Sequence, residues 1–255
     1  MSQSVWLYLD ESGPFRDRSP GGRPVSVVAG LLSWQPLDSA TLRPLLDRAQ
    51  AYGQHGVRDQ DLHAVELRQQ LGADYADWMS TCLEILHQSL PVEAVCFRSS
   101  ERLLTSGAET AYLSVYVEGF AALLAQLLGN APDLRRITVV LENRRLTQLA
   151  DGQEARRDRR GDQSVPRVYV PVEDYAERIQ TRLRLELIRR GWGERLGLLA
   201  GIRHVVSDPS QEKALNYADF ISHHCRFATD GGDREIFTRG IEPILRYDLP
   251  VVLHE

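Results

Sequence analysis

The stretch over residues 5–13, VWLYLDESG, constrains the chain more than any other part of it. Its residues predict a β-strand that is apolar on both faces, which suits a central strand covered on both sides. The run ends in Asp10 and Glu11, followed by Ser12 and Gly13. A buried carboxylate requires a cation or a hydrogen-bonded partner, whereas Asp, Ser and Gly also favour ordinary turns. The stretch alone leaves a site and a turn as open alternatives.

The composition is that of a soluble globular protein, because 43% of the 255 residues are hydrophobic and 25% are charged. This length allows one large domain or two small ones, and we expect a single domain over 1–255. No apolar stretch is long enough to span a bilayer, so no membrane partner is expected. The chain opens without a basic region followed by an apolar run, so no signal peptide is expected.

The cysteines point to a reducing compartment. Cys82, Cys96 and Cys225 are widely spaced and odd in number, which is neither a disulfide framework nor a zinc pattern. With no signal peptide expected, these features predict a cytoplasmic protein.

The net charge of -5 argues against broad electrostatic binding to nucleic acid. Arginine is nevertheless concentrated over 144–167, a polar segment that we expect to be a loop insertion. One interpretation is a solvated loop, and the other is an arm that grips phosphate just downstream of Glu142. Arg144 and Arg145 would be its first contacts with a nucleic acid partner.

The rest of the chain alternates between expected strands and helices. The first two strands, with a Gly- and Pro-rich loop over 13–24 between them, predict a hairpin. A helix precedes the strand over 137–142, so this strand is expected to run parallel to the first. The apolar tail over 235–255 is expected to pack on the domain or on a partner, which a homodimer would provide. After the first strand, expected strands cover 24–34, 92–97, 137–142 and 202–206, with a short extended piece over 168–172, and expected helices cover 36–52, 74–89, 109–128, 173–190 and 211–227.

Acidic residues stand at the ends of several of these elements. Asp10 ends the first strand, Glu142 ends a similarly apolar strand, and Asp208 follows another. Asp219 lies in the last long helix among small and apolar neighbours, unlike a charge on a solvated helix face. Sites in open α/β sheets form beyond the carboxyl ends of strands, so Asp10 and Glu142 would meet there if their strands are neighbours.

Converging carboxylates repel one another unless a cation offsets their charge. Hard divalent ions such as Mg²⁺ prefer oxygen ligands and are often held by a few carboxylates together with substrate phosphates. Two such ions about 4 Å apart can stabilise both the attacking and the leaving oxygen of a phosphodiester. The acids therefore suggest phosphodiester chemistry.

Three segments of the chain resemble the domain-of-unknown-function 3800 family of bacterial and phage proteins. They are YLDESG, HAVEL and SDPSQEKALNYADFI. That family typically opens with a strand ending in DESG, and near its end a Ser-Lys-rich turn leads to a Leu-Gln-x-Ala-Asp helix. Residues 215–219, LNYAD, match this helix, with Asn216 in place of Gln.

The resemblance implies an α/β fold with a ribonuclease-H-like mixed sheet, flanked by helices and with a helical insertion between the second and third strands. It also implies metal ligands on the first strand, the fourth strand and the last helix, where Asp10, Glu142 and Asp219 stand. Glu11 and Asp208 are the second choices as ligands. The implied ion is Mg²⁺ or Mn²⁺.

Three further residues are candidates for contact with substrate. Lys213 would contact a phosphate or simply cap the helix. His63 lines the site if the HAVEL resemblance holds, although with Glu66 it would ordinarily be a surface pair. His223, four residues after Asp219, would steer a water or contact phosphate, or would be a plain surface histidine. Consecutive residues on a helix point about 100° apart, so His223, His224 and Cys225 are not expected to share one ion.

Two functions remain in view. The first is a divalent-metal-dependent nuclease or related phosphodiesterase with Asp10, Glu142 and Asp219 as its catalytic acids. The second is a catalytically silent ribonuclease-H-like module that binds nucleic acid or a protein partner. The chain has no phosphate-binding glycine loop, dinucleotide fingerprint or nucleophile elbow, which lowers the ATPase, dehydrogenase and α/β-hydrolase alternatives.

Overall fold

The computed structural model describes most of the chain. The described residues are 3–13, 26–52, 63–99, 108–142, 201–207, 209, 211–228 and 231–251, with scattered positions over 177–193. The loop expected over 13–24, apart from Gly13, the arginine-rich segment over 144–167 and the extended piece over 168–172 lie outside them. Most of the helix expected over 173–190 does so as well.

A mixed sheet in the order β5-β4-β1-β2-β3-β6 forms the centre of the molecule. The first three strands form an antiparallel meander, whereas β4 and β5 run parallel to β1, and β6 runs parallel to β3. The expected hairpin and the expected parallel strand are both confirmed. The strands are β1 (Gln3–Ser12), β2 (Ser26–Ser33), β3 (Val92–Ser99), β4 (Leu134–Glu142), β5 (Ile202–Ser207) and β6 (Leu245–Val251).

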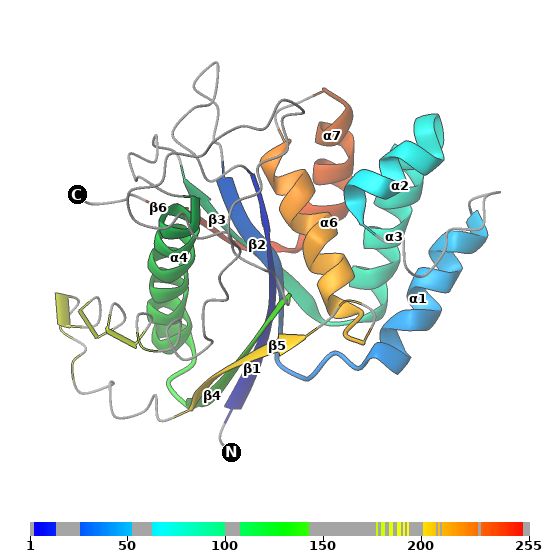
Figure 1. Cartoon of the computed structure of the whole chain (residues 1–255). Helices are drawn as coiled ribbons and strands as arrows, with labels where there is room; N and C mark the ends of the chain where they lie inside the picture. Colours follow the sequence, from blue (N-terminus) through cyan, green and yellow to red (C-terminus); the bar gives the residue numbers. More distant parts are fainter. Residues whose placement is uncertain are drawn as a thin grey trace.

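The central strand β1 is apolar on both faces because both faces of the sheet are covered. Val5, Leu7 and Leu9 pack on one side in a core with α4 (Ala108–Asn130). Tyr8 points to the opposite side, into a second core beneath α6 (Ala214–Arg226). Figure 1 shows α4 alone on its face of the sheet and the remaining labelled helices on the other face.

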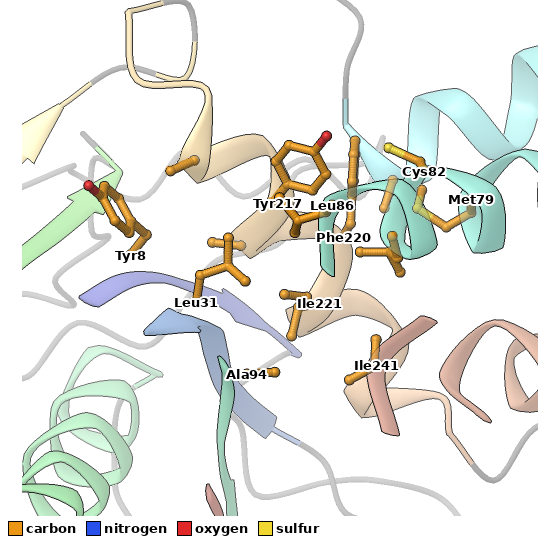
Figure 2. Close-up of a cluster of buried hydrophobic side chains, with 14 of the residues drawn as sticks. Tyr8, Leu31, Met79, Cys82, Leu86, Ala94, Tyr217, Phe220, Ile221 and Ile241 are labelled. Atoms are coloured by element: carbon orange, nitrogen blue, oxygen red, sulfur yellow. The ribbon is translucent and has the colours of Figure 1, made fainter. Parts of the chain in front are cut away.

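The second core joins α6 to a helical layer that stands between β2 and β3 in the chain. Buried Tyr217, Phe220 and Ile221 of α6 lie between Leu31 of the sheet and Met79 of the layer (Figure 2). This layer is the helical insertion that was expected. Its helices are α1 (Ser39–Tyr52), α2 (Ala64–Leu71), a 3₁₀ turn (Gly72–Asp74) and α3 (Tyr75–Ser89).

The start of α1 is later than expected for a local reason. The carboxylate of Asp38 accepts a hydrogen bond from the backbone N–H of Ala40 at 3.1 Å, as an N-terminal capping residue does. The helix therefore begins at Ser39 rather than near residue 36. Leu37 is instead held to the sheet, because its backbone N–H donates to the Tyr8 hydroxyl at 2.8 Å.

The C-terminal tail packs on the domain itself. It forms α7 (Gly231–Ile236), a π-helical turn (Phe237–Ile241), a 3₁₀ turn (Glu242–Ile244) and then β6, which pairs with β3 at the edge of the sheet. Arg98 of β3 fastens this edge, since its side chain donates to Asp248 at 2.8 Å and to the backbone carbonyl of Cys225 at 3.0 Å. The tail was expected to pack on the domain or on a partner, and its described part packs on the domain.

The arrangement is an α/β fold with a mixed sheet flanked by helices, and it is compatible with a ribonuclease-H-like fold. Among the described residues, no helix combines the length and the apolar character that crossing a membrane requires.

Candidate functional site

Asp10 and Glu142 lie at the carboxyl ends of neighbouring parallel strands. The register of β1 and β4 aligns Leu9 with Leu141, so Asp10 and Glu142 are the next residues on their strands. Side chains alternate along a strand, and Tyr8 and Val140, two residues earlier, both pack beneath α6. Asp10 and Glu142 therefore point to the face that α6 covers. Asp10 is almost fully buried, whereas Glu142 is partly exposed.

Asp219 reaches the same region from the helix. α6 packs against β1 and β2, and the Asp219 side chain is 17% exposed. Its Oδ2 accepts a hydrogen bond from the backbone N–H of Ala64, the first residue of α2, at 2.7 Å. The first N–H groups of a helix lack partners within the helix and carry the positive end of its dipole, so they favour a carboxylate. The start of α2 thus holds Asp219 in its ionised form.

His63 adds a titratable cation beside Asp219. Its Nδ1 lies 3.8 Å from Oδ2 of Asp219. The nearby carboxylate of Asp219 raises the pKa of His63 above its ordinary value, against the lowering effect of burial. The charges of Glu66 and Glu142 act in the same direction as Asp219. His63 therefore lies within the field of both the helix acid and the β4 acid.

The pKa of Asp219 reflects opposing effects. Burial tends to raise this pKa, but the neighbouring imidazole of His63 and the hydrogen bond from the Ala64 amide hold it below the ordinary value. The nearby carboxyl group of Asp10 lowers the pKa of Asp219 further. Two neighbouring carboxyl groups repel one another unless they share a proton or a cation lies between them. The site is thus one in which a cation would relieve repulsion.

The donor chemistry of the three acids fits a hard divalent ion. Asp10, Glu142 and Asp219 offer carboxylate oxygens on one face of the sheet, which are the ligands that Mg²⁺ and Mn²⁺ prefer. Among the described residues, a compact group of metal-ligating side chains lies elsewhere, at His223, His224 and Asp233.

The other residues expected near this site are placed differently. Glu11 pairs with Val28, which belongs to the core beneath α4, so Glu11 faces away from Asp10. Lys213 is the N-terminal flanking residue of α6 and is buried, and its backbone N–H donates to Ser39 Oγ at 3.0 Å. Asp208, Arg144 and Arg145 lie outside the described residues.

A second polar group lies farther along α6, towards its C-terminus. His224 is fully buried, with Nδ1 3.0 Å from Oδ1 of Asp233 and Nε2 2.9 Å from the hydroxyl of Tyr75. Asp233 also forms an ion pair with Arg68 of α2. The ring of His223 stands 5.0 Å from that of His224, in an edge-on arrangement. These five residues form what we call the histidine cluster.

His223 is not a plain surface histidine. Burial, followed by the charges of His224 and Arg68, lowers its pKa to about 4, so the ring is neutral near pH 7. One ligand atom from each of His223, His224 and Asp233 lies within 4.8 Å of the other two. Cys225 is not part of this group, so the expectation that His223, His224 and Cys225 do not share one ion stays a prediction. The nitrogens of the two histidines nevertheless converge, because backbone direction does not fix where two rotatable side chains place their nitrogens.

Little in the sequence predicts the histidine cluster. Tyr75 and Asp233 come from distant helices, and nothing in their local patterns pairs them with His224. The available signal was the position of His224, which falls on the buried side of an amphipathic helix. A buried imidazole requires polar partners.

Comparison of the chain with protein-family models found no match, and none of the curated proteins compared with it matches.

Proposed function

We propose that the protein is a divalent-metal-dependent nuclease, or a related phosphodiesterase, that acts on nucleic acid. In this proposal Asp10, Glu142 and Asp219 hold Mg²⁺ or Mn²⁺ and are the catalytic acids. The observation that carries it is the meeting of two strand-end acids with a helix acid on one face of the sheet. The resemblance to the domain-of-unknown-function 3800 family and the compatible sheet order support the same assignment.

The residues at this site would have different roles. Asp10 is fixed by the central strand, and Asp219 is fixed by the amide of Ala64, so both ligands are oriented before an ion arrives. His63 supplies positive charge next to Asp219 and is placed to contact an anionic substrate or to exchange a proton. The bound ion would supply positive charge that stabilises the phosphodiester as it is cleaved.

The same proposal covers where the protein works. The three cysteines are free and buried, which suits a reducing compartment such as the cytoplasm. The arginine-rich segment that follows Glu142 in the chain supplies charge suited to the phosphates of a nucleic acid.

The direct test is cleavage of single-stranded, duplex and hybrid nucleic acids in the presence of Mn²⁺. Asp10→Asn and Asp219→Asn should each lower the rate by at least about 100-fold, because even residues that only orient metal ligands are typically worth 10- to 100-fold. Glu11→Gln, on the opposite face of β1, is the matched control and should keep the rate. If wild type cleaves and both Asn variants cleave equally well, the assignment is wrong.

A silent binding module is the second candidate, and one observation favours it. Oδ2 of Asp219 already accepts the Ala64 amide and faces His63, so part of its capacity is used within the chain. The net charge of -5 points the same way. Calorimetric titration with Mn²⁺ separates the two candidates, since a folded chain that binds no Mn²⁺ at millimolar concentrations would be the silent module.

A further inference from the structure

The histidine cluster is more than a set of satisfied hydrogen bonds. Nε2 of His223 is shielded from solvent and has no hydrogen-bond partner among the described residues. A buried polar atom left in this state destabilises the folded chain. Nδ1 of the neighbouring His224 also lacks a hydrogen bond among the described residues, although Oδ1 of Asp233 lies 3.0 Å from it, whereas Nε2 of His224 has a partner in the Tyr75 hydroxyl. The two nitrogens without hydrogen bonds therefore have room for a ligand that the described part of the chain does not supply.

We propose that His223, His224 and Asp233 bind a transition-metal ion of the Zn²⁺ class, at a site separate from the acids at the strand ends. One ligand atom from each residue lies within 4.8 Å of the others. Imidazole nitrogens select Zn²⁺ and its neighbours over Mg²⁺, so the two sites would differ in the metal they take. Three protein ligands leave a fourth position open in a tetrahedral ion.

The spacing within the cluster agrees with shared ligation. Zn²⁺ binds nitrogen and oxygen at about 2.0–2.2 Å in a tetrahedral arrangement, which places two ligand atoms somewhat over 3 Å apart. Nδ1 of His224 and Oδ1 of Asp233 are 3.0 Å apart, so only a small movement separates them from this geometry. His223 would turn its unpaired nitrogen to the same point.

The surroundings of the cluster also resemble the outer shell of a metal site. A histidine that binds metal through one nitrogen usually hydrogen-bonds through the other, which fixes its orientation. Nε2 of His224 has that partner in the hydroxyl of Tyr75, 2.9 Å away. Asp233 is held in turn by Arg68, an arrangement that orients the carboxylate towards the histidines.

The positive charge of Arg68 opposes metal binding at this site. Its guanidinium pairs with Asp233 and would repel an ion bound to the same carboxylate. The Arg68 side chain is 44% exposed, so water and salt screen that repulsion. The repulsion from Arg68 therefore weakens metal binding at Asp233 without preventing it.

The test uses the full chain, stripped of metal and carrying Asp10→Asn and Glu142→Gln to remove the strand-end acids. Co²⁺ titration followed by visible absorption, then displacement by Zn²⁺, reports the affinity and the coordination of the site. We expect one ion per chain with the intense absorption of four-coordinate Co²⁺. Adding His223→Gln should weaken binding by at least about 100-fold, whereas His204→Gln, beneath α4 on the other face, should leave it unchanged.

His223→Gln is the informative variant because it spares the buried contacts among His224, Asp233 and Tyr75. Far-ultraviolet circular dichroism checks that each variant is folded. A folded chain that binds no Co²⁺, or one whose binding is unaffected by His223→Gln, overturns the metal site. The outcome is independent of the nuclease proposal, since Zn²⁺ binding here can persist when Mn²⁺-dependent cleavage is absent, and cleavage can persist when Zn²⁺ binding is absent.

Discussion

Oδ2 of Asp219 accepts a hydrogen bond from the backbone N–H of Ala64, which lies 155 residues earlier in the chain, at a distance of 2.7 Å. This contact joins the last long helix to the helical layer inserted between β2 and β3. The insertion is thus part of the candidate site, because its α2 helix orients the carboxylate that α6 supplies. Asp219 would be less constrained if the insertion were only an appendage to the sheet.

The His63–Asp219 pair should stabilise the fold within a limited pH window. The pKa of His63 is raised, so its contribution is full below about pH 6.5 and is lost as the pH rises through its folded value. The pKa of Asp219 is lowered, so its contribution is present above about pH 4 and is lost as the pH falls through its folded value. We expect His63→Gln to lower the free energy of unfolding by on the order of 1 kcal/mol near pH 5.5 and by much less near pH 8.5.

Urea unfolding of wild type and His63→Gln at both pH values measures this difference. An equal loss of stability for His63→Gln at both pH values would mean that the ion pair contributes nothing.

Glu142 and Glu11 should differ sharply in metal binding, although each lies at or near the end of its strand. Glu142 shares the face of Asp10, whereas Glu11 faces the α4 side with Val28. Glu142→Gln should weaken Mn²⁺ binding measured by calorimetry by at least about 10-fold, and Glu11→Gln should have little effect. If Glu11→Gln weakens Mn²⁺ binding more than Glu142→Gln does, the face of the sheet assigned to the site is wrong.

His204 should make the protein less stable as the solution becomes mildly acidic. Burial beneath α4 lowers the pKa of His204 to about 4. Since the unfolded value is about 6.5, the unfolded chain binds more protons between these two values, and stability falls as the pH decreases through this range by up to about 3 kcal/mol.

His204→Gln removes this titration and keeps a polar partner for the Tyr116 hydroxyl, which lies 3.0 Å from Nε2 of His204. The stability of this variant, measured by denaturant unfolding between about pH 6.5 and about pH 4.5, should fall less steeply than that of wild type. Parallel curves for the two proteins would contradict the assignment.

Gly30 is expected to be intolerant of any side chain. It pairs with Leu9 on the central strand, and a Cβ at this position would collide with the backbone carbonyl of Tyr8. Because that atom is backbone, β1 and β2 would have to separate just before Asp10. Gly30→Ala should therefore lower the free energy of unfolding, measured by heat or denaturant, by about 1–3 kcal/mol. It should also weaken Mn²⁺ binding.

Gly193→Ala is the matched control, because a Cβ there meets no atom within 4 Å. This variant should change stability by no more than about 0.5 kcal/mol. If Gly30→Ala is tolerated as well as Gly193→Ala, the close approach of β1 and β2 is not as described.

The local pattern of the chain was sufficient to predict most of the sheet and its flanking helices. Strand 137–142 could be placed parallel to the first strand because a crossover helix precedes it, and the structure confirms this with β4. The tail over 235–255 could not be placed, since its pairing partner β3 lies far away in the sequence. Pairing between distant strands depends on the whole sheet and leaves no local signal.

The candidate site, like the fold, could be predicted only in part from the sequence. Asp10, Glu142 and Asp219 could be selected from the sequence because a carboxylate in an apolar strand end or helix is costly without a partner. The common face of Asp10 and Glu142 follows from the parallel register and the alternation of side chains, whereas Asp219 reaches this face because α6 packs on the sheet.

The sequence by itself determined the central strand, most of the helices and strands before the tail, and the candidate acids at the strand ends. Only the tertiary structure decided that the amide of Ala64 and the imidazole of His63 hold Asp219, and that His223, His224 and Asp233 come together. The physical reason is that periodicity and burial act within a few residues, whereas these contacts join helices whose relative positions are set by packing around the sheet.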